Sequence, residues 1–284
     1  MKEWYANAKI NLCLDVAGRY ENGYHELNMI MVPLQLHDTL LWEVADEDAF
    51  VCDDKSLPMD SSNTLVRAAA LMRKTFAIND HFHIQCQKRI PMQAGLAGGS
   101  GDAAALMRGL WEHYSLPCTL AELADLGKQI GADVPFCIHN TCARVGGIGE
   151  RIIPFENRCD FGVLLVKPQQ GVSTKAAFQS LDIDQCPHPS AKACQAALMN
   201  GDFDRFCALA QNSLETSAFA LVKEVAQVKQ ELMAFHFPLV LMSGSGSTVF
   251  ALSNDRNKLH AVKKIMGQRY AFAEVSELLE QKAS

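Results

Sequence analysis

The chain lacks the features that mark several common classes of protein. None of its ten cysteines forms a C-x-x-C pair, which argues against a zinc ribbon. Its longest apolar runs, such as residues 161–166, are too short to span a bilayer, and residues 1–5 carry no apolar signal segment. No block of like charges occurs, and a net charge of −6 argues against a nucleic-acid-binding surface. We therefore expect a cytoplasmic protein that binds neither nucleic acid nor membrane.

Two common phosphate-binding motifs, G-x-x-x-x-G-K-[ST] and G-x-G-x-x-G, are also absent. Residues 90–105 instead hold four glycines and five alanines ahead of an expected helix. Such small residues let a phosphate lie against backbone N–H groups at the positive end of a helix. Seven of the eight residues in 94–101 are Gly, Ala or Ser, which a turn with only a packing role does not require. The segment predicts a nucleotide-phosphate loop.

Two polar residues end this segment. Ser100 can donate its hydroxyl to a phosphate or help to hold a magnesium ion. Asp102 can cap the helix or contribute to the metal site, and its position favours the cap. No other metal ligand is assigned, because the pair His81 and His83 is explained by the alternation of a strand.

The pattern of apolar residues predicts an alternating series of strands and helices. A first strand, 9–16, buries one face and places Lys9 and Asn11 on the other, about 7 Å apart. Asn63 and Thr119 are expected to cap helices, the latter in a capping box with Glu122. Helices are expected at 63–76, 102–114, 119–130, 173–181, 190–199, 203–211, 214–235 and 254–267, and further strands at 27–34, 39–44, 81–88, 142–145, 151–166, 238–242 and 248–252.

Lys9 and Asp133 are candidates for catalysis. Most lysines on the polar face of a strand are only solvated, but a kinase needs a cation near the transferring phosphoryl group. Asp133 precedes Pro135 and so suits the start of a helix. The same carboxylate could orient and deprotonate a substrate hydroxyl, and the two roles are compatible.

Two further segments have both a plain and a functional interpretation. Tyr24 and His25 could anchor a turn, or they could stack on and hydrogen-bond a base. The Ser-Gly-Ser-Gly-Ser segment at 243–247 could be a flexible hairpin tip, or it could let the backbone approach a ligand.

Taken together, these segments resemble the GHMP kinase superfamily. The resemblance rests on residues 8–12, 18–19 and 22–27 at the start of the chain, the glycine loop 90–105, the G-A-D-V-P-F segment 131–136, and residues 243–248. Within the superfamily, the opening and the G-A-D-V-P-F segment resemble the branch that phosphorylates a diphosphocytidyl methylerythritol rather than the homoserine, mevalonate or galactose kinases.

The resemblance implies an α+β fold with two domains. Residues 1–158 would form an N-terminal, ATP-binding domain with a left-handed βαβ unit, and residues 159–284 a ferredoxin-like C-terminal domain. It further implies ATP-dependent phosphorylation of the 2-hydroxyl of the diphosphocytidyl methylerythritol, with Mg²⁺, in the non-mevalonate isoprenoid pathway. A monomer or weak homodimer is expected.

The resemblance also assigns roles to individual residues. Lys9 and Asp133 become the catalytic pair, with Asn11 in support. Tyr24 and His25 would bind cytosine, while Thr174 and Phe178 would form the remaining substrate wall, with Phe178 as a second stacking face. ATP would bind along Pro91, Met92, Gln93, Ala94, Gly95, Leu96, Ala97, Gly98, Gly99, Ser100 and Gly101.

One residue departs from the family pattern. Gly101 stands where the family has a second serine, so one hydroxyl is missing beside the phosphates. Losing one neutral donor costs about 0.5–1.5 kcal/mol, a tenfold effect at most. The missing serine therefore leaves a catalytically impaired nucleotide-binding homologue as one alternative. A related small-molecule kinase, such as a homoserine kinase-like enzyme, is another.

Overall fold

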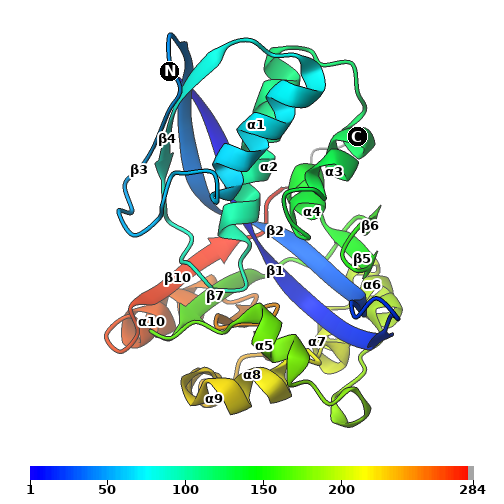
Figure 1. Ribbon diagram of the computed structural model, residues 1–284. Helices are drawn as coiled ribbons and strands as arrows, with labels where there is room; N and C mark the ends of the chain where they lie inside the picture. The colour runs from blue at the N-terminus through cyan, green and yellow to red at the C-terminus, as the bar shows by residue number, and fades with distance from the viewer. Residues whose placement is uncertain (281–284) are drawn as a thin grey trace. The chain divides into compact units, whose positions relative to one another are not determined.

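The computed structural model describes residues 1–280, so the last four residues of the expected second domain, 281–284, lie outside the described residues. Figure 1 shows the ribbon with its helices and strands labelled. The chain divides into two compact units, and neither is continuous in sequence. Unit 1 contains residues 1–8, 36–90 and 97–140, and unit 2 contains residues 9–35, 91–96 and the chain from 141 onward. The expected division after residue 158 stays a prediction about family domains.

Two long strands account for this discontinuity. Strands β1 (Lys2–Arg19) and β2 (His25–Ala45) pair with each other, and each has one end in unit 1 and the other in unit 2. The sequence analysis placed the first strand at 9–16 only, whereas the full strand runs from Lys2 to Arg19. Residues 6–16 are all buried, and burial on both faces hides the alternation that marks a half-exposed strand.

Unit 1 combines strands with four helices. The second half of β2 pairs antiparallel with β4 (His81–Gln87), which in turn pairs parallel with β3 (Ala49–Cys52). The core of this unit includes Trp42, buried against the ring of Trp4 at a centroid distance of 4.1 Å. The helices are α1 (Thr64–Phe76), α2 (Gly98–His113), α3 (Leu120–Gly127) and α4 (Val134–His139).

The helix starts in unit 1 follow their caps. The Asn63 side chain accepts a hydrogen bond from Leu65 N, and Thr119 forms the predicted capping box with Glu122. Both predictions are confirmed. Helix α2, by contrast, begins at Gly98 rather than at residue 102, so the glycines themselves form its first turn. The sequence analysis placed the start too late because glycine has a low helix propensity. Tertiary packing overrides that propensity here.

Unit 2 is built around an antiparallel sheet in the order β10-β7-β9-β8. Helices α9 (Lys223–Met233) and α10 (Arg256–Met266) pack against it. This order, with helical crossovers, is that of a ferredoxin-like domain, and it confirms the predicted α+β class. The strands are β7 (Gly162–Lys167), β8 (Leu239–Met242), β9 (Val249–Ser253) and β10 (Phe272–Glu277), of which β10 was missed.

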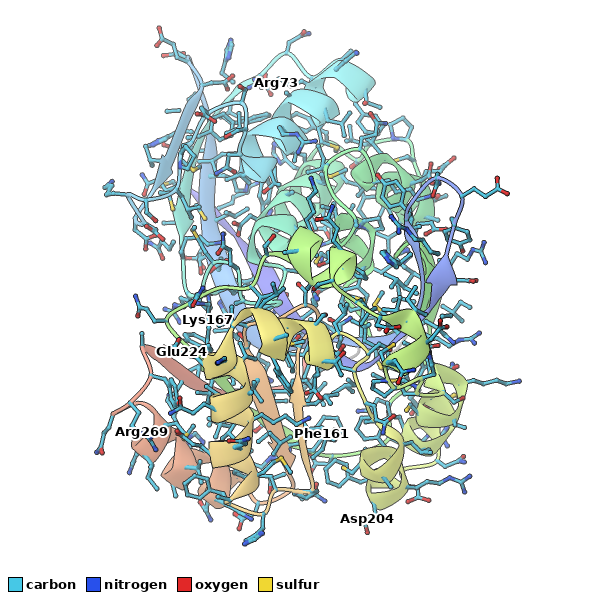
Figure 2. All side chains as sticks on the ribbon, turned by 60° about the horizontal axis from the view of Figure 1, so that its bottom comes forward. Arg73, Phe161, Lys167, Asp204, Glu224 and Arg269 are labelled. Atoms are coloured by element: carbon cyan, nitrogen blue, oxygen red, sulfur yellow. The ribbon has the colours of Figure 1, made fainter. Side chains whose placement is uncertain are left out.

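The remainder of unit 2 contains the first half of β2, two further strands and four helices. That half pairs with β5 (Ala143–Gly147), which pairs with β6 (Arg151–Pro154). Phe161, labelled in Figure 2, stacks with Phe203 and Phe206 at centroid distances of 5.3 and 6.4 Å. The helices here are α5 (Thr174–Gln179), α6 (Ala191–Met199), α7 (Phe203–Leu209) and α8 (Glu215–Leu221).

Two predicted elements of unit 2 are each divided in the structure. The helix expected at 214–235 is α8 and α9, separated by Val222, whose backbone is extended (φ −135°, ψ 97°). The strand expected at 151–166 is β6 and β7. Cys137 and Cys142 are both buried free thiols. Among the helices of residues 1–280, none has the length and apolar content needed to cross a bilayer.

Candidate active site

The second half of the glycine loop forms the N-terminus of α2, in unit 1. Ala97 precedes the helix in the left-handed region (φ 59°, ψ 30°), and its side chain makes no capping hydrogen bond. No acidic residue lies in the first turn. The first amides of α2 therefore have no side-chain cap and carry the positive end of the helix dipole, which suits a phosphate.

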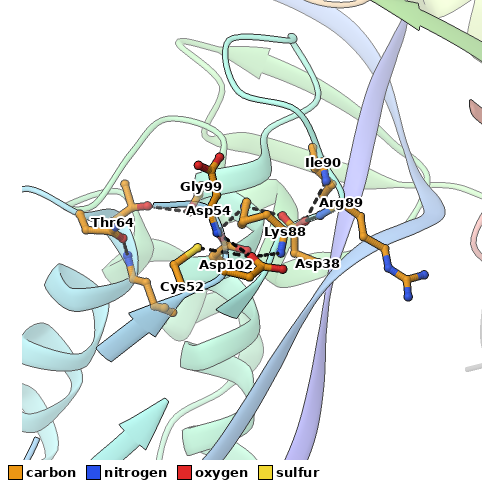
Figure 3. Close-up of polar contacts among 12 residues, drawn as sticks. Asp38, Cys52, Asp54, Thr64, Lys88, Arg89, Ile90, Gly99 and Asp102 are labelled. Carbon is orange, nitrogen blue, oxygen red and sulfur yellow. Dashed lines mark hydrogen bonds and ion pairs between the residues drawn. The ribbon is translucent and has the colours of Figure 1, made fainter. Parts of the chain in front are cut away.

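Asp102 is not the cap that its position suggested, because it lies within α2. Figure 3 shows its carboxylate joined to Lys88, whose Nζ donates to Asp102 Oδ2 (2.7 Å) and to Asp38 Oδ2 (2.5 Å). Asp38 also accepts from Ile90 N at 2.8 Å. Burial raises the pKa of Asp102 to about 7. This cluster anchors the helix to the strand that leads into the loop.

Gly101 has a packing reason that the family comparison did not reveal. A Cβ at this position would lie 3.1 Å from the backbone oxygen of Asn7 in β1, which is closer than ordinary van der Waals contact. A side chain here would thus point toward the strand. Strand packing therefore explains the glycine without any loss of function, and the missing serine hydroxyl supports the impaired homologue less than its chemistry alone implied.

The first half of the loop, in unit 2, lies against residues 243–248. Ser243 Oγ donates to Gly95 O at 3.0 Å, and Thr248 N donates to Ala94 O at 3.2 Å. Gly95 has a φ of +72°, and a Cβ there would overlap the carbonyl oxygen of Ser243. Only glycine combines this conformation with this approach. The two glycine-rich segments of unit 2 therefore form one packed surface, and residues 243–247 are buried rather than a flexible hairpin tip. Their approach to a ligand stays a prediction.

Lys9 and Asn11 belong to the same surface. The sequence analysis placed them on the polar face of a half-exposed strand, but only 4% of Lys9 and 2% of Asn11 is exposed. Lys9 Nζ donates to Asn11 Oδ1 at 2.8 Å, and Lys9 N donates to Leu96 O at 3.1 Å. A buried ammonium is costly without partners, so the merely solvated lysine is excluded.

Asp133 precedes α4, in unit 1, and is half-buried. Its backbone is helical (φ −85°, ψ −12°), and its side chain makes no capping hydrogen bond to α4. Pro135 lies at the start of the helix as expected. The capping role that competed with catalysis is therefore not the one this carboxylate performs. The pairing of Asp133 with Lys9 stays a prediction.

The predicted substrate residues gather in unit 2. The ring of His25 stacks on that of Phe178, and the Thr174 hydroxyl lies 2.8 Å from Ser245 Oγ. Tyr24 is 60% exposed. Burial and the positive charge of Arg19 lower the pKa of His25, which favours a neutral imidazole able both to donate and to accept. The structure thus brings Thr174 to the 243–247 loop and Phe178 to His25.

Sequence reasoning missed two groups that hold this surface in place. Asn212 is fully buried and bonds to the backbone on both sides of Ser243. Lys88 ties α2 to Asp38 as described above. Neither residue carries a motif, because each acts through tertiary contacts with distant residues. Within residues 1–280, no three His, Cys, Asp or Glu side chains group so as to hold a metal by themselves.

The chain matches two family models. That for the N-terminal domain of GHMP kinases covers residues 63–141, and that for the C-terminal domain covers residues 194–271. A 4-diphosphocytidyl-2-C-methyl-D-erythritol kinase of a Geobacillus species is 40% identical over 259 residues, which are 90% of each chain. A protein of the same name from Bacillus cytotoxicus is 39% identical over 259 residues, again 90% of each.

Solved structures agree with these relatives. A crystal structure of 4-(cytidine 5'-diphospho)-2C-methyl-D-erythritol kinase matches with a TM-score of 0.84 and 30% identity, over 99% of this chain and 100% of that one. A homoserine kinase from Cytophaga hutchinsonii matches with a TM-score of 0.73 over 97% and 96% of the two chains, but its 17% identity shows the fold alone. The chain therefore belongs to the GHMP kinases, small-molecule kinases that use ATP, and within them to the 4-diphosphocytidyl-2-C-methyl-D-erythritol kinase family.

Proposed function

We propose that this kinase transfers the γ-phosphoryl group of ATP to the 2-hydroxyl of 4-diphosphocytidyl-2-C-methyl-D-erythritol, a step of the non-mevalonate isoprenoid pathway. The observation that carries the proposal is the joint surface of unit 2. There Lys9 is hydrogen-bonded to Asn11. The proposed phosphate loop and Thr174 both contact the glycine-rich segment 243–247. The names of the relatives support the choice of substrate.

The chemistry assigned to the catalytic pair follows from charge. Asp133 accepts the proton of the tertiary hydroxyl as that oxygen attacks the γ-phosphorus. Lys9 stabilises the negative charge that develops on the attacking oxygen. Asn11 holds the ammonium in place through its Oδ1. The bond from the γ-phosphorus to the bridging oxygen breaks, and ADP leaves.

The cytosine is the part of the substrate that distinguishes it from homoserine. Tyr24, His25 and Phe178 present two aromatic rings and an imidazole within unit 2, which suits a planar base. A neutral His25 can hydrogen-bond the edge of cytosine. A homoserine substrate offers no base to these side chains, so the aromatic group favours the cytidine compound.

The residues at the start of α2 fit ATP with Mg²⁺. The first turn of α2 offers uncapped amides and no carboxylate, and Ser100 adds a hydroxyl. Mg²⁺ usually takes only one or two protein ligands when phosphates and water complete its octahedron, so a protein cluster is not needed. When bound, the ion would neutralise charge on the phosphates. Ser100 is the residue we assign to hold it.

We also propose a cytoplasmic location and a monomer or weak homodimer. All ten cysteines are free thiols, which suits a reducing compartment.

Light scattering after size exclusion, from micromolar concentrations upward, tests the oligomeric state. A dimer that persists on dilution would contradict it.

The activity is tested by incubating the protein with ATP, Mg²⁺ and a panel of alcohols. The panel contains 4-diphosphocytidyl-2-C-methyl-D-erythritol, homoserine and mevalonate. We expect ADP and a singly phosphorylated product only with the first. Turnover of homoserine alone would establish the homoserine kinase alternative, and ATP binding without turnover of any alcohol would establish the impaired homologue.

A further inference from the structure

Asn212 is a fully buried amide that lies just before α8. Its Nδ2 donates one hydrogen bond to Met242 O and another to Gly244 O, each at 2.8 Å. Its Oδ1 accepts from Leu214 N at 2.9 Å. The side chain therefore uses both amide hydrogens on the two carbonyls that flank Ser243, while its oxygen fixes the amide plane.

Those two carbonyls belong to the segment that touches the Lys9–Asn11 pair. Gly244 has a φ of +58°, and a Cβ there would lie 3.2 Å from Asn11 Oδ1 and 3.4 Å from Lys9 Nζ. Ser243 Oγ accepts from Asn11 N at 3.3 Å and donates to Gly95 O. If the backbone at 243–244 shifted, it would therefore displace the side chains of Lys9 and Asn11 and the phosphate loop.

Glu215, three residues farther on, holds the neighbouring end of β8. Its Oε1 accepts from Met242 N at 2.9 Å, and its Oε2 accepts from Lys229 Nζ at 2.6 Å. Residues 212 and 215 therefore bind Met242 through both its carbonyl and its amide. The start of α8 acts as a fixed support for the glycine-rich segment, whose own residues offer little rigidity.

Only an amide satisfies this position. Aspartate has the same shape but donates nothing when ionised, so its second oxygen would face two carbonyl oxygens in a buried site. Serine could donate to only one of them. The position requires two hydrogen-bond donors on one side chain. This requirement explains why a buried asparagine occurs where an apolar residue would have a lower desolvation cost.

We propose that Asn212 is a positioning residue for phosphoryl transfer, which sets the backbone at 243–244 and through it the Lys9–Asn11 pair. The proposal rests on the proposed function only for the role of Lys9. It assigns Asn212 no contact with either substrate. Displacing a reacting group by about 1 Å can cost about 100-fold in rate, so kcat rather than KM carries the effect.

The test compares Asn212→Asp and Asn212→Ser with two matched controls. Asn254→Asp makes the same chemical change at an exposed residue of unit 2. Phe206→Leu disturbs the core of unit 2 and serves as a control for lost stability. We expect kcat to fall about 100-fold for Asn212→Asp and less for Asn212→Ser, while KM for both substrates stays within threefold. Both controls should keep kcat within twofold.

Two readouts do not depend on activity. Acylation of Lys9 by an amine reagent, followed by mass spectrometry, should be at least tenfold faster in Asn212→Asp than in the parent or in Phe206→Leu. Amide hydrogen exchange of a peptide covering 241–250 should speed up in the same variant only. Unchanged labelling and exchange in Asn212→Asp, or equal changes in Phe206→Leu, would overturn the proposal.

These readouts also separate this proposal from the proposed function. A parent protein that phosphorylates none of the alcohols would overturn the function but leave the labelling and exchange results to decide on the loop. An active parent whose Asn212→Asp variant keeps full kcat would overturn the positioning role alone.

Discussion

The imidazole of His25 stacks on the phenyl ring of Phe178, with centroids 5.0 Å apart and planes inclined by 30°. A base inserted between two rings needs about 7 Å, twice the carbon contact distance. In the proposed cytosine site, the base therefore takes the place of His25 on the face of Phe178, or stacks outside the pair. Tyr24 is 60% exposed, and we propose its ring as the second stacking partner of the base.

Tyr24→Ala should therefore raise KM for the cytidine substrate and leave kcat nearly unchanged. Losing one base–aromatic stack costs about 1–3 kcal/mol, or roughly 5–150-fold in KM. Initial-rate kinetics with saturating ATP measure the effect. Tyr5→Ala, at a 50% exposed tyrosine of unit 1, is the control. An unchanged KM in Tyr24→Ala would remove the stacking role.

Asp133→Ala should reduce kcat while leaving the affinity for a cytidine ligand within a few-fold. A general base contributes about 10²–10⁴-fold to the rate, and Asp133 supplies no capping bond whose loss would unfold α4. Rapid-quench kinetics measure the chemical step, and calorimetry measures binding. Asp125→Ala removes an exposed carboxylate of α3 as the comparison. A near-normal kcat in Asp133→Ala would assign the base elsewhere.

Gly101→Ser should lower thermal stability without improving catalysis. The added Cβ meets Asn7 O at 3.1 Å, so strand and helix must move apart slightly. Overpacking of this kind costs about 1–3 kcal/mol. Thermal unfolding and KM for ATP are the measurements. A lower KM for ATP together with a higher kcat would show instead that the missing hydroxyl limits this enzyme.

Lys88→Met should strongly destabilise unit 1. The substitution leaves Asp38 and Asp102 buried without their shared cation, and breaking a buried ion pair in this way costs about 3–5 kcal/mol. Urea unfolding gives the free energy. Lys128→Met, which removes an exposed partner of Asp125, should cost less than about 1 kcal/mol. Equal effects of the two substitutions would contradict a structural role for the buried cluster.

The His188–Asp15 pair predicts a pH-dependent stability. Hydrogen bonding to Asp15 raises the pKa of His188, so the pair stabilises the fold fully below the ordinary histidine pKa of about 6.5. This stability is lost as pH rises through the raised value. Asp15→Asn should therefore lower the free energy of unfolding at pH 5.5 and change it less at pH 9. Because His188 is 44% exposed, the difference should not exceed about 1 kcal/mol.

The sequence predicted the local features of the fold well. Caps such as Asn63 and the Thr119–Glu122 box act within four residues, so their signal is contained in a short segment. The extent of β1 was underestimated because both of its faces are buried. The break at Val222 was missed because α8 and α9 together continue one apolar pattern.

The family motifs pointed to the residues proposed for the site. They did not point to the residues that hold the site in place through contacts with distant parts of the sequence. The motifs gave the residues proposed for the phosphate loop, Lys9 and Asn11, and the 243–247 segment, and the roles of these residues stay predictions. They gave no sign that Asp102 pairs with Lys88, because the spacing of these residues in sequence says nothing about their contact across a strand and a helix. Asn212 escaped for the same reason, since its partners lie 30 and 32 residues away.

The interleaved composition of the two units bears on how the protein can be divided. A fragment ending at residue 158 would carry residues 9–35 and 91–96 without most of unit 2, to which they belong. A fragment starting at 159 would lack Lys9, Asn11 and the first half of the phosphate loop. Neither half should therefore be recoverable as a piece that folds on its own.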